Sequence, residues 1–251
     1  MAGHSHWAGI KYKKGAADAK RGKLFSKLAR KIIVAARSGG GDPDSNLQLR
    51  YAVDEAKSAN MPKDNIERAI KKGTGDLDGV IMNEVVYEGY GPSGVAIIAE
   101  VLTDNRNRTV AEVRKLFERF GGNIGSSGCV SWMFSTKGTI HLEDSKITED
   151  ELMEIALEAG AEDIKHEGKM FEILTETANF EVVREAIVAR GIEPVHAQIS
   201  RIPSSTVPVD EKAGRKIISL INSLEDHDDV VNVYANYDLA DEIMEKIFAE
   251  A

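Results

Sequence analysis

The sequence predicts an α+β protein of several domains: an N-terminal three-helix bundle with a basic arm, an α+β domain, and an inserted ferredoxin-like βαββαβ domain. Helical apolar periods fill residues 23–72 with no strand pattern between them, whereas strand and helix patterns alternate after about residue 80. The chain has 251 residues, which is more than one ordinary core accommodates and enough for two or three domains.

The first 75 residues predict the arm and the bundle. Residues 1–22 have four glycines, many charges and no apolar period, so we expect an extended or loosely ordered arm. Residues 23–37 place their apolar side chains in one arc of a helix and their cations in another. A second helix is expected at 45–59 and a third at 62–72, which begins with Pro62 and ends at a glycine.

The next segment predicts a hairpin and a helix. Strand-like runs at 85–88 and 95–101 flank the sequence GYGPSG, and a helix is expected at 107–120. The glycines of this loop, Gly89 to Gly94, match the G-x-G-x-x-G pattern of dinucleotide sites. That pattern requires a helix directly after it. Here a second strand follows and Pro92 lies inside the loop, so a hairpin turn is favoured.

Residues 131–203 show the order β-α-β-β-α-β of a split βαβ unit, and Thr148 and Glu151 have the spacing of a helix capping box. The prolines of 203–208 predict a hinge. A helix at 210–225, a strand at 230–237 and a C-terminal helix are too few for a domain. We expect the domain boundaries to be 1–22, 23–78, 79–130 together with 206–251, and 131–205.

Charge divides the chain sharply. Lys and Arg exceed Asp and Glu by nine in residues 1–75, whereas the whole chain carries a net charge of −9. Folding rarely requires such a division, because net charge governs association more than fold. A basic head that meets a polyanion, attached to an acidic body that repels one, is the expected arrangement.

The candidate binding residues lie in the basic head and in one polar loop at 104–109. Clustered cations beside aromatic residues are the electrostatic footprint of nucleic-acid-binding proteins. The candidate nucleic-acid-binding residues are Trp7, Lys11, Lys13, Lys14, Lys20, Arg21, Lys23, Lys27, Arg30, Lys31, Arg106 and Arg108.

Each of these features has a simpler interpretation. A charge run is often only a solvated face, and Trp7 could anchor the arm to the bundle as well as stack on bases. The loop arginines could be merely exposed beside a helix cap at Asn107. The turn 60–62 also makes residues 45–72 resemble a helix-turn-helix, with four cations on its second helix, although many helical bundles contain such a turn.

Catalytic and metal motifs are absent from the sequence, which favours a binding protein without a cofactor. Cys129 is the single cysteine, so it cannot form an intrachain disulfide. The acidic run 225–229 could bind a cation, but a solvated turn is favoured because it lacks calcium-loop spacing. The glycines of 122–128 could present backbone N–H groups to an anion. No apolar run could span a membrane, and the first residues do not form a secretory signal, so we expect a cytoplasmic monomer.

Long motifs identify the chain as similar to a known family. They are GHSHWAGIKYKK (3–14), KRGKLFSKLARKI (20–32), NMPKDNIERAIKKG (60–73), YEGYGPSGVAIIAEVLTDNRNRT (87–109), GGNIGSSGCVSWMF (121–134) and LEDHDDVVNVY (224–234). Together they resemble the YebC family, which includes the mitochondrial translational activator of cytochrome c oxidase subunit I. The resemblance covers nearly the whole chain and implies three domains, the third inserted in the second.

The resemblance also implies a function in gene expression. Bacterial members commonly carry the label of probable transcriptional regulatory protein, which implies DNA binding. The mitochondrial relatives are understood as translation factors that act on the ribosome and ease synthesis of proline-rich stretches. We therefore expect a non-enzymatic, ribosome-associated translation factor whose basic arm contacts rRNA, with a DNA-binding transcriptional regulator as the alternative.

Overall fold

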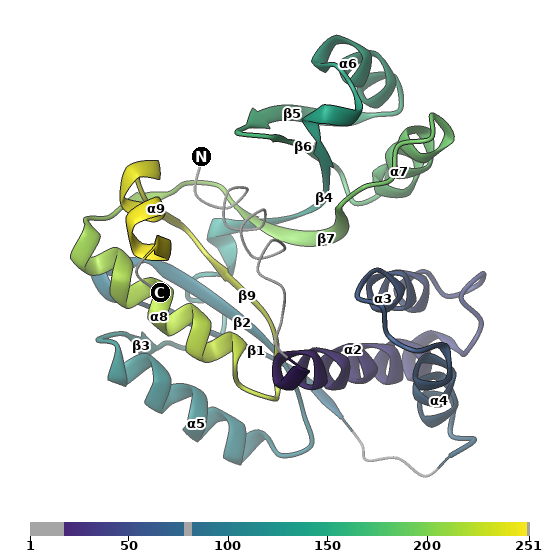
Figure 1. The fold of residues 1–251 in the computed structure, drawn as a ribbon. Helices are drawn as coiled ribbons and strands as arrows, with labels where there is room; N and C mark the ends of the chain where they lie inside the picture. Colours follow the sequence, from purple (N-terminus) through teal and green to yellow (C-terminus); the bar gives the residue numbers. More distant parts are fainter. Residues whose placement is uncertain (1–17, 78–81, 250–251) are drawn as a thin grey trace. The chain divides into compact units, whose positions relative to one another are not determined.

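Three helices form the first part of the chain (Figure 1). The computed structural model describes residues 18–77 and 82–249. Within them α2 (Asp18–Gly39), α3 (Leu47–Ser58) and α4 (Lys63–Thr74) follow one another in sequence. Their buried faces share one apolar core, made of Leu28, Ile32, Ala35, Ala36, Leu49, Ala52, Val53, Ala56, Met61, Ile66 and Ala69.

Helix α2 begins five residues before the predicted start, so the expectation of an extended arm up to residue 22 is wrong for residues 18–22. The added turn is rich in Ala, Lys and Arg, which are good helix formers. Its sequence has no apolar period, and Arg21 and Gly22 are exposed. A periodicity argument therefore cannot detect this turn, although backbone propensity can extend a helix through it.

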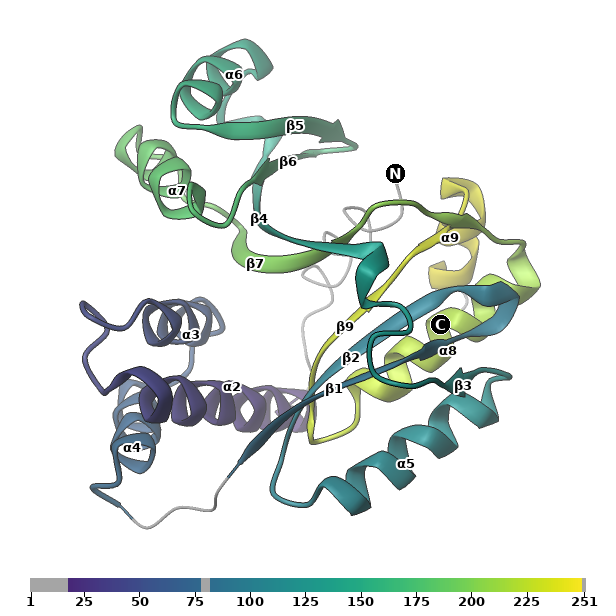
Figure 2. The same ribbon diagram turned by 180° about the vertical axis from the view of Figure 1, so that it is seen from behind.

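The first sheet follows the bundle in sequence and has the strand order β3-β1-β2-β9. All of its pairings are antiparallel. Its strands, and the helices next to them in sequence, are β1 (Asn83–Tyr90), β2 (Ala96–Thr103), α5 (Arg106–Arg119), β3 (Asn123–Ile124), α8 (Glu211–Glu225) and β9 (Val230–Ala235). Strand β2 lies between β1 and β9 (Figure 2) and is buried along most of its length, as expected for its largely apolar sequence AIIAEVLT.

The hairpin prediction for Gly89–Gly94 is confirmed. Strands β1 and β2 pair from Tyr90 and Ala96 outward, and a short 3₁₀ turn, Pro92–Gly94, joins them. The Gly91 N–H donates to the Val95 carbonyl at 2.8 Å. Ser93 and Gly94 both have positive φ, which closes the turn and leaves no helix to receive a pyrophosphate.

The second sheet is formed by residues 134–203 in the order β5-β6-β4-β7. Its elements, in chain order, are β4 (Phe134–Glu143), α6 (Glu149–Glu158), β5 (Ala161–Glu167), β6 (Met170–Thr175), α7 (Phe180–Ala189) and β7 (His196–Pro203). The predicted capping box is confirmed, with Thr148 and Glu151 each bonding the backbone of the other.

The segment predicted as a hinge contains a short strand, β8 (Val207–Pro208), which pairs in parallel with β10 (Tyr237–Asp238). Proline has no N–H to give to a sheet. The neighbouring residues donate instead: Val207 to the Asn236 carbonyl at 2.7 Å and Val209 to the Asp238 carbonyl at 2.9 Å. Residues 207 and 208 are thus extended strand, and α9 (Asp241–Ala249) follows.

By contacts the chain forms two compact units. Among the described residues, one unit contains Trp132–Glu211 and the chain from Asn236 onward, and the other contains residues 18–131 together with Lys212–Ala235. The four-part division with boundaries at 22, 78, 130 and 205 stays a prediction. Among the described residues, none of the helices is long and apolar enough to cross a membrane.

Candidate nucleic-acid interface

Helix α2 gathers predicted binding residues into one stripe. Lys23, Lys27 and Arg30 are spaced four and three residues apart, so they lie above one another on the helix surface. The opposite face carries Leu28 and Ile32, which are fully buried in the core of the bundle. Burial of the apolar face thus fixes which way the cations point.

The stripe is hydrogen-bonded within the chain. Its acceptors lie in the acidic turn, defined here as residues 225–229, at the end of α8. Lys23 Nζ donates to the Asp226 carbonyl at 3.2 Å. Lys27 Nζ donates to the Glu225 carbonyl and Arg30 Nη1 to the Asp228 carbonyl. A helix leaves its last carbonyls without helical partners and carries partial negative charge there, which explains why cations bind at this end of α8.

Lys31 is also bound internally. Its Nζ lies 2.9 Å from both carboxylate oxygens of Glu55 on α3 and 3.3 Å from Asn232 Oδ1 on β9. Asn232 in turn donates to Glu100 Oε2 at 2.9 Å. One lysine therefore joins two helices of the bundle to the edge strand of the first sheet.

The carboxylate of Asp229 contacts residues from both predicted binding regions, the basic helix and the polar loop. Its side chain is 6% exposed. Oδ2 accepts hydrogen bonds from Thr109 at 2.7 Å, Arg108 at 2.8 Å and Thr103 at 3.0 Å. Arg30 of α2 lies 3.3 Å from Oδ1. The basic stripe and the polar loop 104–109, predicted separately, thus meet on one carboxylate.

The contacts around Asp229 shift two pKa values. Burial raises the pKa of Asp229, but the hydrogen bonds from Arg108, Thr109 and Thr103 and the nearby charge of Arg30 outweigh it, so the pKa is lowered. The hydrogen bonds to Asp229 and Asp104 raise the pKa of Arg108. Asp229 is therefore a fixed anion at neutral pH.

The interpretation of 225–229 as a solvated turn is wrong for Asp229, although the side chains of Asp226 and Asp228 are exposed. The alternative, a site for a bound metal cation, is not formed by the described residues; the carbonyls of the turn accept hydrogen bonds from cationic side chains of α2. The sequence contained a signal for this pairing, since a basic helix and an acidic run have complementary charge. It gave no register, because backbone carbonyls supply three of the acceptors.

In the loop 104–109 the helix cap is Asn105, so the expected cap at Asn107 is wrong. Asn105 Oδ1 accepts from the Arg108 N–H at 3.1 Å and α5 begins at Arg106. Asn107 is exposed and is the second residue of α5, so it lies two positions too late to be the cap. Arg106 is exposed, whereas Arg108 also reaches Asp104 at 2.9 Å.

The remaining predicted residues are placed only in part. Trp7, Lys11, Lys13 and Lys14 lie outside the described residues. Lys20 lies in the first turn of α2 and Arg21 is exposed beside it. The outer face of α4 adds further exposed cations, Lys63, Arg68 and Lys71.

Of the glycines in 122–128, Gly128 alone contributes to an N–H cradle, which continues to Ser131 and holds a carboxylate of the chain. Glu88 Oε1 accepts from Gly128 at 2.7 Å, while Oε2 accepts from Ser131 at 2.8 Å and Val130 at 2.9 Å. Burial raises the pKa of Glu88, but these backbone hydrogen bonds outweigh it and the pKa is lowered. The cradle thus fastens β1 to the loop and is closed to a phosphate.

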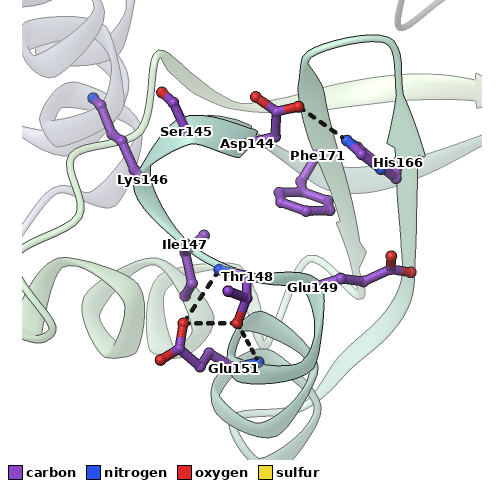
Figure 3. Close-up of a pocket in the computed structure, with 9 residues that line it drawn as sticks. All are labelled: Asp144, Ser145, Lys146, Ile147, Thr148, Glu149, Glu151, His166 and Phe171. Carbon is purple, nitrogen blue, oxygen red and sulfur yellow. Dashed lines mark hydrogen bonds and ion pairs between the residues drawn. The ribbon is translucent and has the colours of Figure 1, made fainter.

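A shallow pocket of about 440 Å³ lies beside the first turn of α6 (Figure 3). Asp144 Oδ2 and His166 Nε2 are 3.3 Å apart across one side of it, and Glu149 and Glu151 line another. The negative charges of Glu149 and Glu151 would repel a phosphate at the N-terminus of α6. Within residues 18–77 and 82–249, no group of three His, Cys, Asp or Glu side chains is arranged to hold a metal ion.

Two family models cover most of the chain. Residues 5–76 match the TACO1/YebC protein N-terminal domain, and residues 82–237 match the TACO1/YebC second and third domain. The chain belongs to the TACO1/YebC family. The family resemblance found in the sequence motifs is therefore confirmed, and the two models meet between α4 and β1.

Relatives in the TACO1/YebC family match from end to end. A probable transcriptional regulatory protein of Desulfotalea psychrophila is 56% identical over 98% of this chain and 99% of its own. One of Syntrophobacter fumaroxidans is 55% identical over 98% of this chain and 100% of its own. The crystal structure of a conserved hypothetical protein from Aquifex aeolicus is 50% identical, with a TM-score of 0.86 over 95% of this chain and 99% of that one.

Proposed function

We propose that this protein is a non-enzymatic, nucleic-acid-binding regulator of gene expression that acts on the ribosome by binding rRNA. The observation that carries the proposal is the division of charge. Residues 1–75 hold a surplus of nine cations in a chain whose net charge is −9. Phosphate backbones attract such a head without regard to sequence, and the acidic remainder limits how the protein can lie on a polyanion.

The described residues support a binding role through the outer surface of the bundle. Arg21 on α2 and Arg68 and Lys71 on α4 are exposed, whereas the apolar faces of both helices are buried. The relatives are named probable transcriptional regulatory proteins, which supports a nucleic-acid ligand at the coarser level. The family resemblance favours translation over transcription. We propose a cytoplasmic monomer without a cofactor.

Binding to DNA as a transcriptional regulator is the second candidate. The printed names of the relatives favour it. So does the short turn between α3 and α4, which places the cations of α4 on the second of two consecutive helices. Readers of this kind bind as symmetric dimers with fixed half-site spacing.

The test is co-sedimentation with purified ribosomes from DNase-treated lysate at low and moderate salt. A full-length Lys11→Glu/Lys13→Glu/Lys14→Glu variant removes three cations from the arm. A matched variant, Lys115→Glu/Lys212→Glu/Lys216→Glu, makes the same charge change at exposed positions on α5 and α8. A deletion variant of the arm should remove only residues before 18, because removal of residues 1–22 would cut into α2.

We expect salt-sensitive ribosome binding that the arm variant loses and the matched variant retains. If three phosphate contacts are lost, the slope of log affinity against log salt decreases by about 2–3. Equal loss of ribosome binding in both variants would show that binding depends on net charge and not on the arm. Retention on a promoter fragment without ribosome binding would instead establish the transcriptional candidate.

A further inference from the structure

The basic stripe of α2 has a polyanion-like ligand in the same chain. Lys23, Lys27 and Arg30 donate to three carbonyls of the acidic turn, which follow one another along the backbone at 225, 226 and 228. The side chains of Asp226 and Asp228 project from the same turn and are exposed. A nucleic-acid strand likewise offers a series of backbone oxygens to a row of cations, and its phosphate oxygens carry full negative charge.

We infer that the acidic turn and an RNA backbone compete for the stripe Lys23, Lys27 and Arg30, so that RNA binding releases the bundle from the acidic turn. This inference rests on the proposed function, because it names the α2 stripe as part of the RNA surface and gives that surface an internal occupant. The contact between α2 and the acidic turn is called the latch below.

The bundle has an apolar core that does not include the latch. Its core consists only of apolar residues between Leu28 and Ala69, and partly buried neighbours such as Phe25, Ala29 and Ile70 pack against it. Helix α2 packs on α3 and α4 through that core, with Gly73 allowing close approach to Ala36. A bundle with its own core can move as a rigid body when the latch opens, and the hydrogen bond from Lys31 to Asn232 on β9 then opens with it.

The latch consists of interactions that phosphates can replace. Lys23 is exposed, and the Arg30 side chain is 22% exposed. Partly hydrated charge pairs are weakened by salt and contribute little net free energy, because each group exchanges one polar partner for another. A phosphate carries a full charge, whereas a helix-terminal carbonyl carries a fraction of one. An RNA backbone is therefore a stronger partner for each lysine than the carbonyl it replaces.

Release would also change the surroundings of Asp229. Arg30 leaves its Oδ1, while Arg108, Thr103 and Thr109 remain on Oδ2 from within the first sheet and α5. Asp229 therefore keeps three partners and stays charged when the latch is open. The acidic turn itself persists, because the Asp226 N–H donates to Asn222 and the His227 N–H to Leu224 independently of α2.

The experiment measures latch opening and RNA affinity in the same full-length protein. Fluorophores are attached at Ser58→Cys on α3 and Arg114→Cys on α5, both exposed, in a Cys129→Ser background. Poly(U) is added at low salt, and energy transfer and fluorescence anisotropy are recorded together. The release variant is Asp226→Asn/Asp228→Asn, which keeps the three carbonyl acceptors and buried Asp229 but removes the two exposed charges that attract the stripe to the acidic turn. Its matched control, Glu84→Gln/Glu118→Gln, removes two exposed carboxylates elsewhere.

We expect poly(U) to lower energy transfer in the wild type with the same midpoint as binding, because the two equilibria are linked. The release variant is expected to start at lower energy transfer and to bind poly(U) about tenfold more tightly, a coupling of ordinary size. The control is expected to resemble the wild type in energy transfer and to gain less than half of that affinity.

Three outcomes would overturn the inference. Binding of poly(U) with unchanged energy transfer shows that RNA does not open the latch, and leaves the proposed function intact. Equal affinity gains in the release variant and the control reduce the effect to general charge. Absence of poly(U) and ribosome binding removes the proposed function and the competition together. A change of energy transfer with salt alone would then show a polar latch without an RNA role.

Discussion

At the scale of single residues, Asp229 and Gly73 make close contacts between elements that the sequence does not reveal. Asp229 satisfies two threonines and an arginine through one oxygen and meets Arg30 through the other. Neither its burial nor its partners can be read from an acidic run. Gly73 lies where α4 crosses α2, and a Cβ there would be 2.6 Å from both Ala36 Cβ and the Ile33 carbonyl. In the sequence it was visible only as the end of a helix.

Replacement of Gly73 with alanine is expected to separate α2 from α4. The new methyl group meets a backbone carbonyl that cannot rotate away, and overpacking of this kind costs about 1–3 kcal/mol. Gly22→Ala is the matched control, because nothing lies within 4 Å of its Cβ and it is in the same helix. It should stabilise by about 0.5–1 kcal/mol. Urea unfolding of both variants gives the comparison, and equal stabilities would contradict the close packing.

At the scale of elements, caps and loops fix where α5 and the glycine loop begin and end. The helical period predicted α5 within one residue, yet it assigned the cap to the wrong asparagine. Asn105 has extended backbone angles and receives the Arg108 N–H, whereas Asn107 is already inside the helix. Two asparagines two residues apart have equal capping propensity, so only backbone geometry decides between them.

Asn105→Ala is expected to destabilise the protein by about 1 kcal/mol, because an N–H at the start of α5 loses its acceptor. Asn107→Ala, one helical position inside α5 and exposed, is expected to change stability by less than about 0.5 kcal/mol. The free energy of unfolding from denaturant titration distinguishes the two. A larger effect at Asn107 would place the start of α5 two residues later.

At the scale of the whole molecule, opposite charges meet inside the chain. Lys31, Arg30 and Arg108 are paired with Glu55, Asp229 and Asp104. Part of the cationic surplus of residues 1–75 is thus bound to acids and carbonyls from elsewhere in the sequence. While the latch is closed, the cations available to a polyanion are fewer than the sequence count suggests.

Acid is expected to weaken the unit that contains Asp229 and Glu88. Both pKa values are lowered by folding, so their contribution is complete above the unfolded values of about 3.9 and 4.3 and is lost as pH falls through the lower folded values. Unfolding free energy is therefore expected to decrease from about pH 4.5 downward. Asp229→Asn/Glu88→Gln should be less stable at neutral pH and depend less on pH in this range.

The control for this acid effect is Glu84→Gln/Asp228→Asn, which removes the same charge from exposed positions. Its unfolding free energy should follow the pH dependence of the wild type. If the buried-pair variant retained the full pH dependence, the acid sensitivity would have to come from other carboxylates.

The sequence by itself determined the kinds and order of the longer helices and strands, the hairpin at Gly89–Gly94, the capping box at Thr148 and the family, but not the two-residue strands β3 and β8. Each of these depends on local spacing or on long contiguous motifs, which sequence carries directly. Only the tertiary structure decided which groups the cations of α2 contact. Lys27 and Arg30 bind carbonyls 198 residues away, and every residue type has a carbonyl, so no side-chain pattern marks such an acceptor. Charge predicted that the basic head needs a negative partner, and folding supplied one of those partners from the same chain.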